Sequence, residues 1–288
     1  MLEPNRDSAA LRRAINRKGL MTIIRLPRRI LALVAGACCA TALAVFAPAL
    51  PAANAESLRD RIPIMAGTAL ELPDHQQCTA GPVLRSRSLI SRLTYLGAAT
   101  RYVILPKHCA PEGAIVRVAG QIVGRVTWTS PRYDIGIVTV PPSTVQRPVC
   151  SGPSQLHHCT VPTATPKAVG RVILSRGQLQ GTVPLSQTGE PSSGERFCIS
   201  GAVTFTSCGF GFSDAAPVAL PSGALGARSY DGHLPEHGDS GGPVISVHGT
   251  LYGIIICRAT RADTIILGYL PIAFVLREIG ENYELAPA

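Results

Sequence analysis

The stretch Gly238-Asp239-Ser240-Gly241-Gly242-Pro243 carries the most information in this 288-residue sequence. A serine hydroxyl is a poor nucleophile until a base takes its proton and backbone N–H groups stabilise the oxyanion that forms. The glycines on both sides of Ser240 permit a tight turn, because glycine adopts backbone conformations that other residues avoid. The stretch therefore indicates a nucleophilic serine on a turn, rather than a glycine-rich turn with a structural role alone.

The same residues also fit a second nucleophile pattern. Gly238, Ser240 and Gly242 match G-x-S-x-G, which in α/β-hydrolases is followed along the chain first by the acid and then by the histidine. After Ser240 the only histidine is His248, and it precedes the only later aspartate, Asp263. This order excludes an α/β-hydrolase triad, so the base and the acid must lie upstream of the serine.

Two upstream segments supply candidates for the base and the acid. His108 follows the apolar run Tyr102–Leu105, and Asp134 stands directly before the apolar run Ile135–Val138. Ser240 would attack the substrate, His108 would take and return the proton, and Asp134 would orient the imidazole. A lone histidine or aspartate is more often structural, and the order of the three residues is what favours catalysis here.

These segments resemble the chymotrypsin-like serine proteases. The serine stretch matches the family's G-D-S-G-G-P motif, His108-Cys109 resembles its A-A-H-C segment, and Tyr133–Val138 resembles its D-I-A-L strand. Glu236–Ser240 and Phe197–Gly201 are similar to segments of the bacterial streptogrisin and α-lytic protease branch. The resemblance covers roughly residues 63–281.

The resemblance implies an all-β fold of two antiparallel six-stranded β-barrels, followed by a C-terminal α-helix. The first barrel would supply His108 and Asp134, and the second would supply Ser240, with the site in the cleft between them. Backbone N–H groups of Gly238 and Ser240 would form the oxyanion hole. The predicted division is residues 1–55 for an N-terminal extension and signal peptide, 56–148 for the first barrel, and 149–288 for the second barrel and the helix.

Local patterns agree with an all-β chain that ends in one helix. Short runs rich in valine and isoleucine flank a turn in two places and predict two hairpins: 114–119 with 122–128, and 244–247 with 251–256. Pro141-Pro142 begins the expected linker between the barrels. Apolar residues at i, i+3, i+4 and i+7 from Ile272 predict a helix that begins after Pro271 and ends before Gly280.

The cysteines predict three disulfides and one free thiol. Seven cysteines follow residue 55, and export would place them in an oxidising compartment. The predicted pairs are Cys150–Cys159 and Cys198–Cys208 as local loop closures and, by the family resemblance, Cys78–Cys109, which leaves Cys257 unpaired. His157-His158-Cys159 lacks a second well-spaced ligand pair, so no metal and no cofactor are expected.

Residues 1–55 are typical of a secretory leader. The arginine-rich stretch 25–29 precedes the uncharged run Ile30–Ala47, and Ala53-Asn54-Ala55 supplies small residues for cleavage after Ala55. The apolar run also reaches the lower limit for spanning a bilayer, so a retained membrane anchor stays an alternative. Too few residues follow Ala55 for a folding pro-region, which leaves unaided folding or trimming near Glu56–Arg61 as alternatives.

The net charge of +9 does not indicate nucleic-acid binding. Residues 1–55 hold eight Lys or Arg and two Asp or Glu, so the rest of the chain carries only +3. A nucleic-acid-binding protein usually shows a concentrated basic face. We therefore expect a polypeptide substrate, no nucleic acid, and no membrane contact if the leader is cleaved.

The substrate pocket is harder to predict than the chemistry. Leu234, Ile255, Ile256 and Cys257 are the candidates for its wall. No carboxylate is expected there to bind Arg or Lys, so the predicted preference is a small or medium apolar side chain before the scissile bond. Two positions depart from the family pattern. Lys107 would either favour neutral His108 or point to water, and Leu234 replaces the cysteine of a pocket-wall disulfide.

Three functions fit these observations. The first is a secreted, monomeric serine endopeptidase that acts through His108, Asp134 and Ser240. The second is a catalytically weak binding module with the protease fold, which the departures at Lys107 and Leu234 suggest. The third is a membrane-anchored protease at the cell surface, which the long apolar run in the leader suggests.

Overall fold

The computed structural model describes residues 57–146, 148–151, 158–176, 179–213, 220–261 and 264–288. The chain separates into two compact units, Met1–Asn54 and Ala55–Ala288, and the described residues belong to the second. The predicted leader, its cleavage site and the possible anchor lie outside the described residues. Within the described ranges, no helix has both the length and the apolar character needed to cross a bilayer.

The second half of the described chain forms a closed barrel of six strands. The strands are β14 (Phe197–Gly201), β15 (Phe205–Phe212), β16 (Leu225–Ser229), β17 (Pro243–Ile245), β18 (Thr250–Arg261) and β19 (Thr264–Pro271). They pair in the order β18-β17-β14-β15-β16-β19, and β19 pairs back with β18 to close the ring. Buried aromatic side chains of Phe197, Phe210 and Tyr269 fill its core. The predicted hairpin around His248-Gly249 is β17 with β18, as expected.

The first half forms an open barrel. Its strands are β2 (Ala69–Glu71), β3 (Gln77–Thr79), β4 (Val83–Ser86), β5 (Arg101–Leu105), β6 (Ile115–Val118), β7 (Gln121–Thr129), β8 (Gly136–Val140) and β20 (Tyr283–Leu285). They pair in the order β20-β4-β5-β8-β7-β6-β2-β3. The hairpin predicted around Gly120 is β6 with β7, and Ala119 and Gly120 both adopt positive φ there. The two-barrel fold is therefore confirmed, but the first sheet is open and has eight strands in place of the predicted six, one of them β20 from the C-terminal end.

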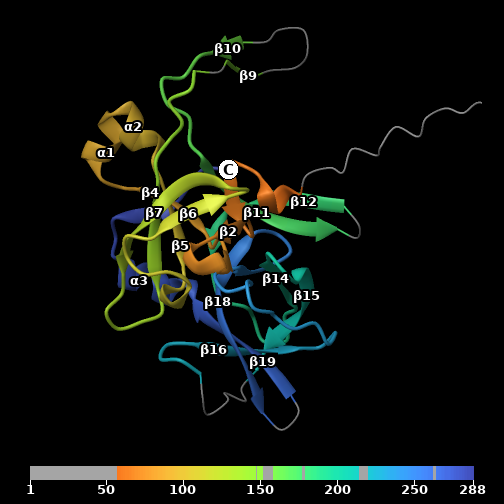
Figure 1. The fold of residues 1–288 in the computed structure, drawn as a ribbon. Helices are drawn as coiled ribbons and strands as arrows, with labels where there is room; N and C mark the ends of the chain where they lie inside the picture. Colours follow the sequence, from red (N-terminus) through yellow and green to blue (C-terminus); the bar gives the residue numbers. More distant parts are fainter. Residues whose placement is uncertain (1–56, 147, 152–157, 177–178, 214–219, 262–263) are drawn as a thin grey trace, which may run out of the picture. The chain divides into compact units, whose positions relative to one another are not determined.

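The two ends of the described chain connect the halves. Near the start, β1 (Ile64–Ala66) pairs with β11 (Ala168–Arg176), which also pairs with β12 (Leu179–Pro184). At the end, β20 pairs with β4 of the first sheet. The short strand β13 (Gln187–Thr188) pairs with β18, and β9 (Val149–Ser151) pairs with β10 (His158–Thr160). The pairings of β1 with β11 and of β20 with β4 join the half that carries His108 to the half that carries Ser240 (Figure 1).

The predicted C-terminal helix is confirmed as α3 (Ile272–Ile279), with Pro271 before it and Gly280 at φ 82° after it. Two further helices, α1 (Leu89–Leu93) and α2 (Tyr95–Ala99), lie between β4 and β5 and were not predicted. Each has only five residues, too few to show a helical repeat in the sequence. The described residues also contain three single-turn 3₁₀ helices: η1 (Leu58–Asp60), η2 (Pro73–His75) and η3 (Lys107–Cys109).

The cysteine predictions are confirmed. Disulfides join Cys78 to Cys109, Cys150 to Cys159, and Cys198 to Cys208. Cys257 is the free cysteine among the described residues. The first disulfide crosses from β3 to η3, so it fixes the turn that carries His108. The second joins β9 to β10, and the third joins β14 to β15.

Candidate active site

His108 and Asp134 meet through two contacts. His108 lies in η3, directly after β5, and Asp134 lies just before β8, which pairs with β5. The backbone N–H of His108 donates to Asp134 Oδ1 at 2.9 Å, and Nδ1 of the ring lies 2.6 Å from Oδ2. A carboxylate can only accept, so Nδ1 carries the proton and Nε2 is left with a free lone pair. This is the orientation in which an imidazole can act as a base.

The turn that holds Asp134 is tied to the C-terminal helix. The Ser130 hydroxyl oxygen accepts the backbone N–H of Tyr133 at 3.0 Å, and the hydroxyl donates to Glu278 Oε1 at 2.7 Å. The Tyr133 ring packs edge-on against Phe274, with ring centroids 4.6 Å apart. Because Glu278 and Phe274 both belong to α3, the helix holds the Asp134 turn in place.

Lys107 makes a contact that the sequence analysis did not predict. Its ammonium donates to the backbone carbonyl of Ser130 at 2.8 Å. The residue is exposed, but its ammonium is bound to a carbonyl of the protein and is not left to water alone. The contact joins the turn of His108 to the turn of Asp134, which is consistent with a structural rather than an electrostatic role. The sequence gave no sign of this partner, because 23 positions separate the two residues.

Thr79, a residue of the first half, holds the turn Gly238–Gly242 that carries Ser240 (the serine turn). The backbone N–H of Thr79 donates to the carbonyl of Ser240 at 2.8 Å, and its hydroxyl donates to the carbonyl of Gly238 at 2.7 Å. The Thr79 hydroxyl also accepts the N–H of Ala202 at 2.8 Å. Gly241 has φ +92°, and a Cβ at this position would lie 2.2 Å from the Thr79 carbonyl oxygen. Only glycine therefore fits beside Ser240.

The same arrangement leaves two N–H groups available. Gly238 has φ +104°, and its carbonyl and that of Ser240 are both taken by Thr79. The N–H groups of Gly238 and Ser240 donate to no acceptor among the described residues. A pair of free backbone donors beside a nucleophile can stabilise an oxyanion. These are the two donors that the resemblance implies, and their role stays a prediction.

The Asp239 side chain forms hydrogen bonds that fix the segment before Ser240. Its carboxylate is fully buried. Oδ1 accepts the N–H groups of Val203 and Thr204, and Oδ2 accepts the Thr204 hydroxyl and the N–H of Glu236. A buried carboxylate needs such donors to offset its loss of water. The segment Glu236–Ser240 is therefore fixed at both ends.

A buried arginine lies near this carboxylate. Arg59, in η1, is only 1% exposed and donates to the carbonyl of Gly67 at 2.6 Å and to the Ser200 hydroxyl at 3.1 Å. Burial lowers the pKa of Arg59 to about 10, while the charge of Asp239 acts in the opposite direction. Sequence reasoning missed Arg59, since nothing near it in the chain marks a buried cation.

Ser240 and His108 both line two hollows. One, of about 360 Å³, has both residues in its wall together with Ile255, Ile256 and Cys257. The other, of about 460 Å³, has both residues beside the Cys78–Cys109 disulfide. Within the described residues, the Ser240 hydroxyl and the imidazole share these walls without a hydrogen bond between them. Such bonds often form only when a substrate is present.

The 360 Å³ hollow differs in part from the predicted pocket. Ile255, Ile256 and Cys257 line it, whereas Leu234 is absent from its wall. Glu236 and Arg258 also line it, with their charged groups 3.9 Å apart. A carboxylate is therefore present, contrary to expectation, and a guanidinium faces it.

The free thiol in this wall is a weak acid. Burial raises the pKa of Cys257, and the negative charge of Asp134 raises it further. The thiol is thus mainly neutral at neutral pH, and it behaves as a small apolar group in the wall.

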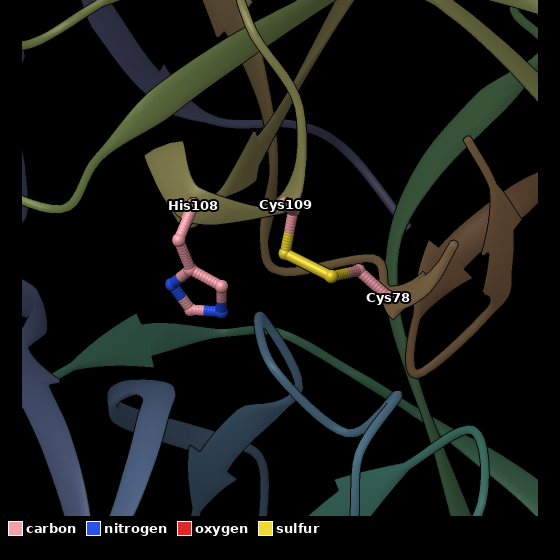
Figure 2. Close-up of side chains that lie close together, drawn as sticks. All are labelled: Cys78, His108 and Cys109. Atoms are coloured by element: carbon pink, nitrogen blue, oxygen red, sulfur yellow. A yellow bond between two sulfur atoms is a disulfide. The ribbon is translucent and has the colours of Figure 1, made fainter. Parts of the chain in front are cut away.

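One group near the site has the composition of a metal centre. Figure 2 shows the His108 ring beside Cys78 and Cys109, and their potential ligand atoms lie within 4.8 Å of one another. The two sulfurs are bonded to each other, and only a thiolate is an effective metal ligand. The group is therefore a disulfide that positions the histidine turn. Of the other motif considered for zinc, His157 lies outside the described residues and Cys159 is bonded to Cys150.

Comparison with known proteins gives the fold. No protein-family profile matches the chain, and no curated protein matches it. Among solved structures, Thermobifida fusca protease A is 18% identical, with a TM-score of 0.53 over 78% of this chain and 99% of its own. Nocardiopsis protease is 16% identical, with a TM-score of 0.52 over 77% and 98%. Cellulomonas bogoriensis chymotrypsin is 16% identical, with a TM-score of 0.52 over 78% and 99%. The chain therefore has the chymotrypsin fold.

Proposed function

We propose that this protein is a secreted serine endopeptidase of the streptogrisin and α-lytic protease branch, with His108, Asp134 and Ser240 as its catalytic triad. The observation that carries the proposal is the two-point contact between His108 and Asp134, together with the place of His108 beside Ser240 in the walls of the same two hollows. The names of the similar structures, two proteases and a chymotrypsin, support the same class of reaction.

The chemistry follows from the hydrogen bonds of these groups. His108 Nε2 takes the proton of Ser240 as Oγ bonds to the scissile carbonyl carbon, and Asp134 stabilises the imidazolium that results. The N–H groups of Gly238 and Ser240 donate to the oxyanion. The imidazolium then gives its proton to the leaving amine as the C–N bond breaks. Water, activated in the same way, releases the acyl group from Ser240.

The two hollows support internal cleavage of a polypeptide. His108 and Ser240 line both hollows, which offers room for substrate residues beyond the one before the scissile bond. Ile255 and Ile256 favour a small or medium apolar side chain in the 360 Å³ hollow. Glu236 does not offer a free charge to a basic side chain, because Arg258 faces it at 3.9 Å. A peptide library cleaved mainly after Arg or Lys would contradict this preference.

Hydrolysis of such a library by the wild type, Ser240→Ala, His108→Ala and Asp134→Asn tests the proposed reaction. Loss of a triad member typically lowers turnover by about 10⁴–10⁶. A folded wild type that binds peptides without cleaving them would favour the binding-module alternative. Fractionation of producing cells separates a secreted enzyme from a membrane-anchored one.

A further inference from the structure

Helices α1 and α2 form a hairpin, residues Leu89–Ala99, that leaves most of its apolar side chains in water. Leu89, Ile90, Leu93, Tyr95 and Leu96 are each more than half exposed. In the described hairpin, Ala99 is the only buried residue. The helices pack mainly on each other, and Figure 1 shows them beside β4, to one side of the strands. Soluble proteins seldom expose so many large apolar groups together unless another surface covers them.

The hairpin is held in one shape. Thr94 ends α1 and begins α2, and its hydroxyl oxygen accepts the N–H of Gly97 at 3.0 Å. A Cβ at Gly97 would lie 2.3 Å from the carbonyl oxygen of Ser91, so the two backbones meet there closely. Arg101, which is buried, donates to the carbonyl of Ala98 at 2.8 Å and closes the base. The exposed side chains thus project from an ordered element.

The chain around the hairpin is basic. From position 85 to position 101 it has four arginines and no acidic residue. Three of these arginines, Arg85, Arg87 and Arg92, share one carboxylate, that of Glu284, at 2.6, 3.4 and 2.5 Å. One negative charge cannot balance three positive ones, so a net positive charge remains beside the apolar side chains.

We propose that the hairpin docks on an anionic lipid surface. Apolar side chains flanked by arginine and tyrosine are the composition of segments that lie in the membrane interface. Each helix, with five residues, is about 7.5 Å long at 1.5 Å per residue. Both helices are far too short to span a bilayer, so their apolar side chains would enter only the headgroup region, to a depth of roughly 5–10 Å. The arginines would then meet lipid phosphates.

A second copy of this chain is the less favourable occupant. A two-fold contact through the hairpin would bring the same arginines of both copies together, and like charges repel. The lipid proposal does not depend on the proposed catalytic function or on the fate of residues 1–55. It concerns only the surface of the described unit.

Tryptophan fluorescence in the full chain tests the proposal locally. Leu93→Trp places a reporter on the hairpin, and Phe212→Trp, an exposed position on β15, is its matched control. The native Trp128 gives the same background in both. With vesicles of phosphatidylglycerol and phosphatidylcholine, we expect emission from position 93 to shift to the blue and to be quenched by brominated lipid, with no change at position 212. A reporter on the hairpin separates docking there from any binding by the leader.

Replacement of single arginines gives a second, quantitative test of the proposal. Arg87→Gln and Arg92→Gln should each lower the vesicle affinity reported by position 93 about fivefold. Vesicles made only of phosphatidylcholine should also bind more weakly than vesicles that contain phosphatidylglycerol. If Leu93→Trp fails to fold, Tyr95→Trp on α2 replaces it. An unchanged signal at position 93 on vesicles that do bind the chain would overturn the proposal. So would a blue shift that needs no lipid and grows with protein concentration, which would identify a second copy as the occupant.

Discussion

At the scale of single residues, the serine turn depends on a threonine from the other half of the molecule. Thr79 binds the carbonyl groups of Gly238 and Ser240 and so fixes the peptide groups that join Gly238 to Asp239 and Ser240 to Gly241. The glycine at position 241 is required because its backbone touches this threonine. The serine motif alone therefore does not make the site, and Thr79 is a positioning residue for it.

Thr79→Val should impair catalysis more than substrate binding. Valine keeps the shape of threonine but leaves the Gly238 carbonyl and the Ala202 N–H without a partner. Each buried unpaired group costs about 1–3 kcal/mol. A displaced turn can lower kcat up to about 100-fold, with little change in KM. The control is Thr139→Val, since the Thr139 hydroxyl contacts only the exposed Thr127. Equal kcat values for the two variants would contradict the role of Thr79.

Cys257 should react slowly with thiol reagents at neutral pH, and its modification should block the hollow. A raised pKa means a smaller thiolate fraction at any given pH, so the rate should keep rising above the pH at which an ordinary cysteine reaches its maximum. Benzyl methanethiosulfonate should stop peptide hydrolysis by the wild type and leave Cys257→Ser active. Fast modification at pH 7 would contradict the raised pKa of Cys257, and modification without inhibition would show that the thiol does not line the substrate pocket.

At the scale of elements, segments from the two ends of the described chain support the active site. η1 inserts Arg59 near Asp239, and α3 holds the Asp134 turn through Glu278. Neither element has a residue in the walls of the two hollows that His108 and Ser240 line. Glu278 of α3 bonds directly to the turn before Asp134, whereas Arg59 bonds to Gly67 and Ser200 and acts on Asp239 only through its charge.

Removal of Arg59 should destabilise the protein and limit how far its N-terminus can be trimmed. Arg59→Ala leaves the Gly67 carbonyl and the Ser200 hydroxyl without their donor and should lower the free energy of unfolding by roughly 3 kcal/mol. Arg117→Ala, whose guanidinium bonds only to an exposed turn, is the control. A chain that begins at residue 57 should cleave peptides, and one that begins at residue 63 should be less stable and less active. Equal stability and activity of the two truncated chains would contradict this role.

The contact between α3 and the Asp134 turn should be visible in kinetics. Glu278→Ala removes the acceptor of the Ser130 hydroxyl and of the Arg132 guanidinium. We expect a loss of about 1 kcal/mol in stability and a fall in kcat as Asp134 becomes less well fixed. Glu281→Ala, an exposed glutamate just past the helix, is the matched control. Thermal unfolding and peptide hydrolysis of both variants test this role of Glu278. An unchanged kcat in Glu278→Ala would contradict it.

At the scale of the whole molecule, the correct predictions rest on local patterns. The hairpins at Gly120 and Gly249, helix α3 and the local disulfides each involve residues close in sequence. The two-barrel fold came from the family resemblance of a few short motifs. These motifs identify the candidate triad because its three members lie in turns with a recognisable composition.

The features that were missed depend on partners distant in the chain. Arg85 meets Glu284 across 199 positions, and Thr79 meets Gly238 across 159. The addition of β20 to the first sheet and the burial of Arg59 are further examples, because each requires knowledge of which strands become neighbours. Helices α1 and α2 were missed for a different reason, since five-residue helices show no repeat.

The most direct test of the central claim is labelling by a fluorophosphonate, with the modified residue identified by peptide mass spectrometry. A fluorophosphonate reacts with a serine only when a base has activated it beside an oxyanion hole. We predict one label, on Ser240, that is absent in Ser240→Ala and strongly reduced in His108→Ala and Asp134→Asn. A folded chain that takes no label at Ser240, or that labels equally well without His108, would contradict the assignment of the triad.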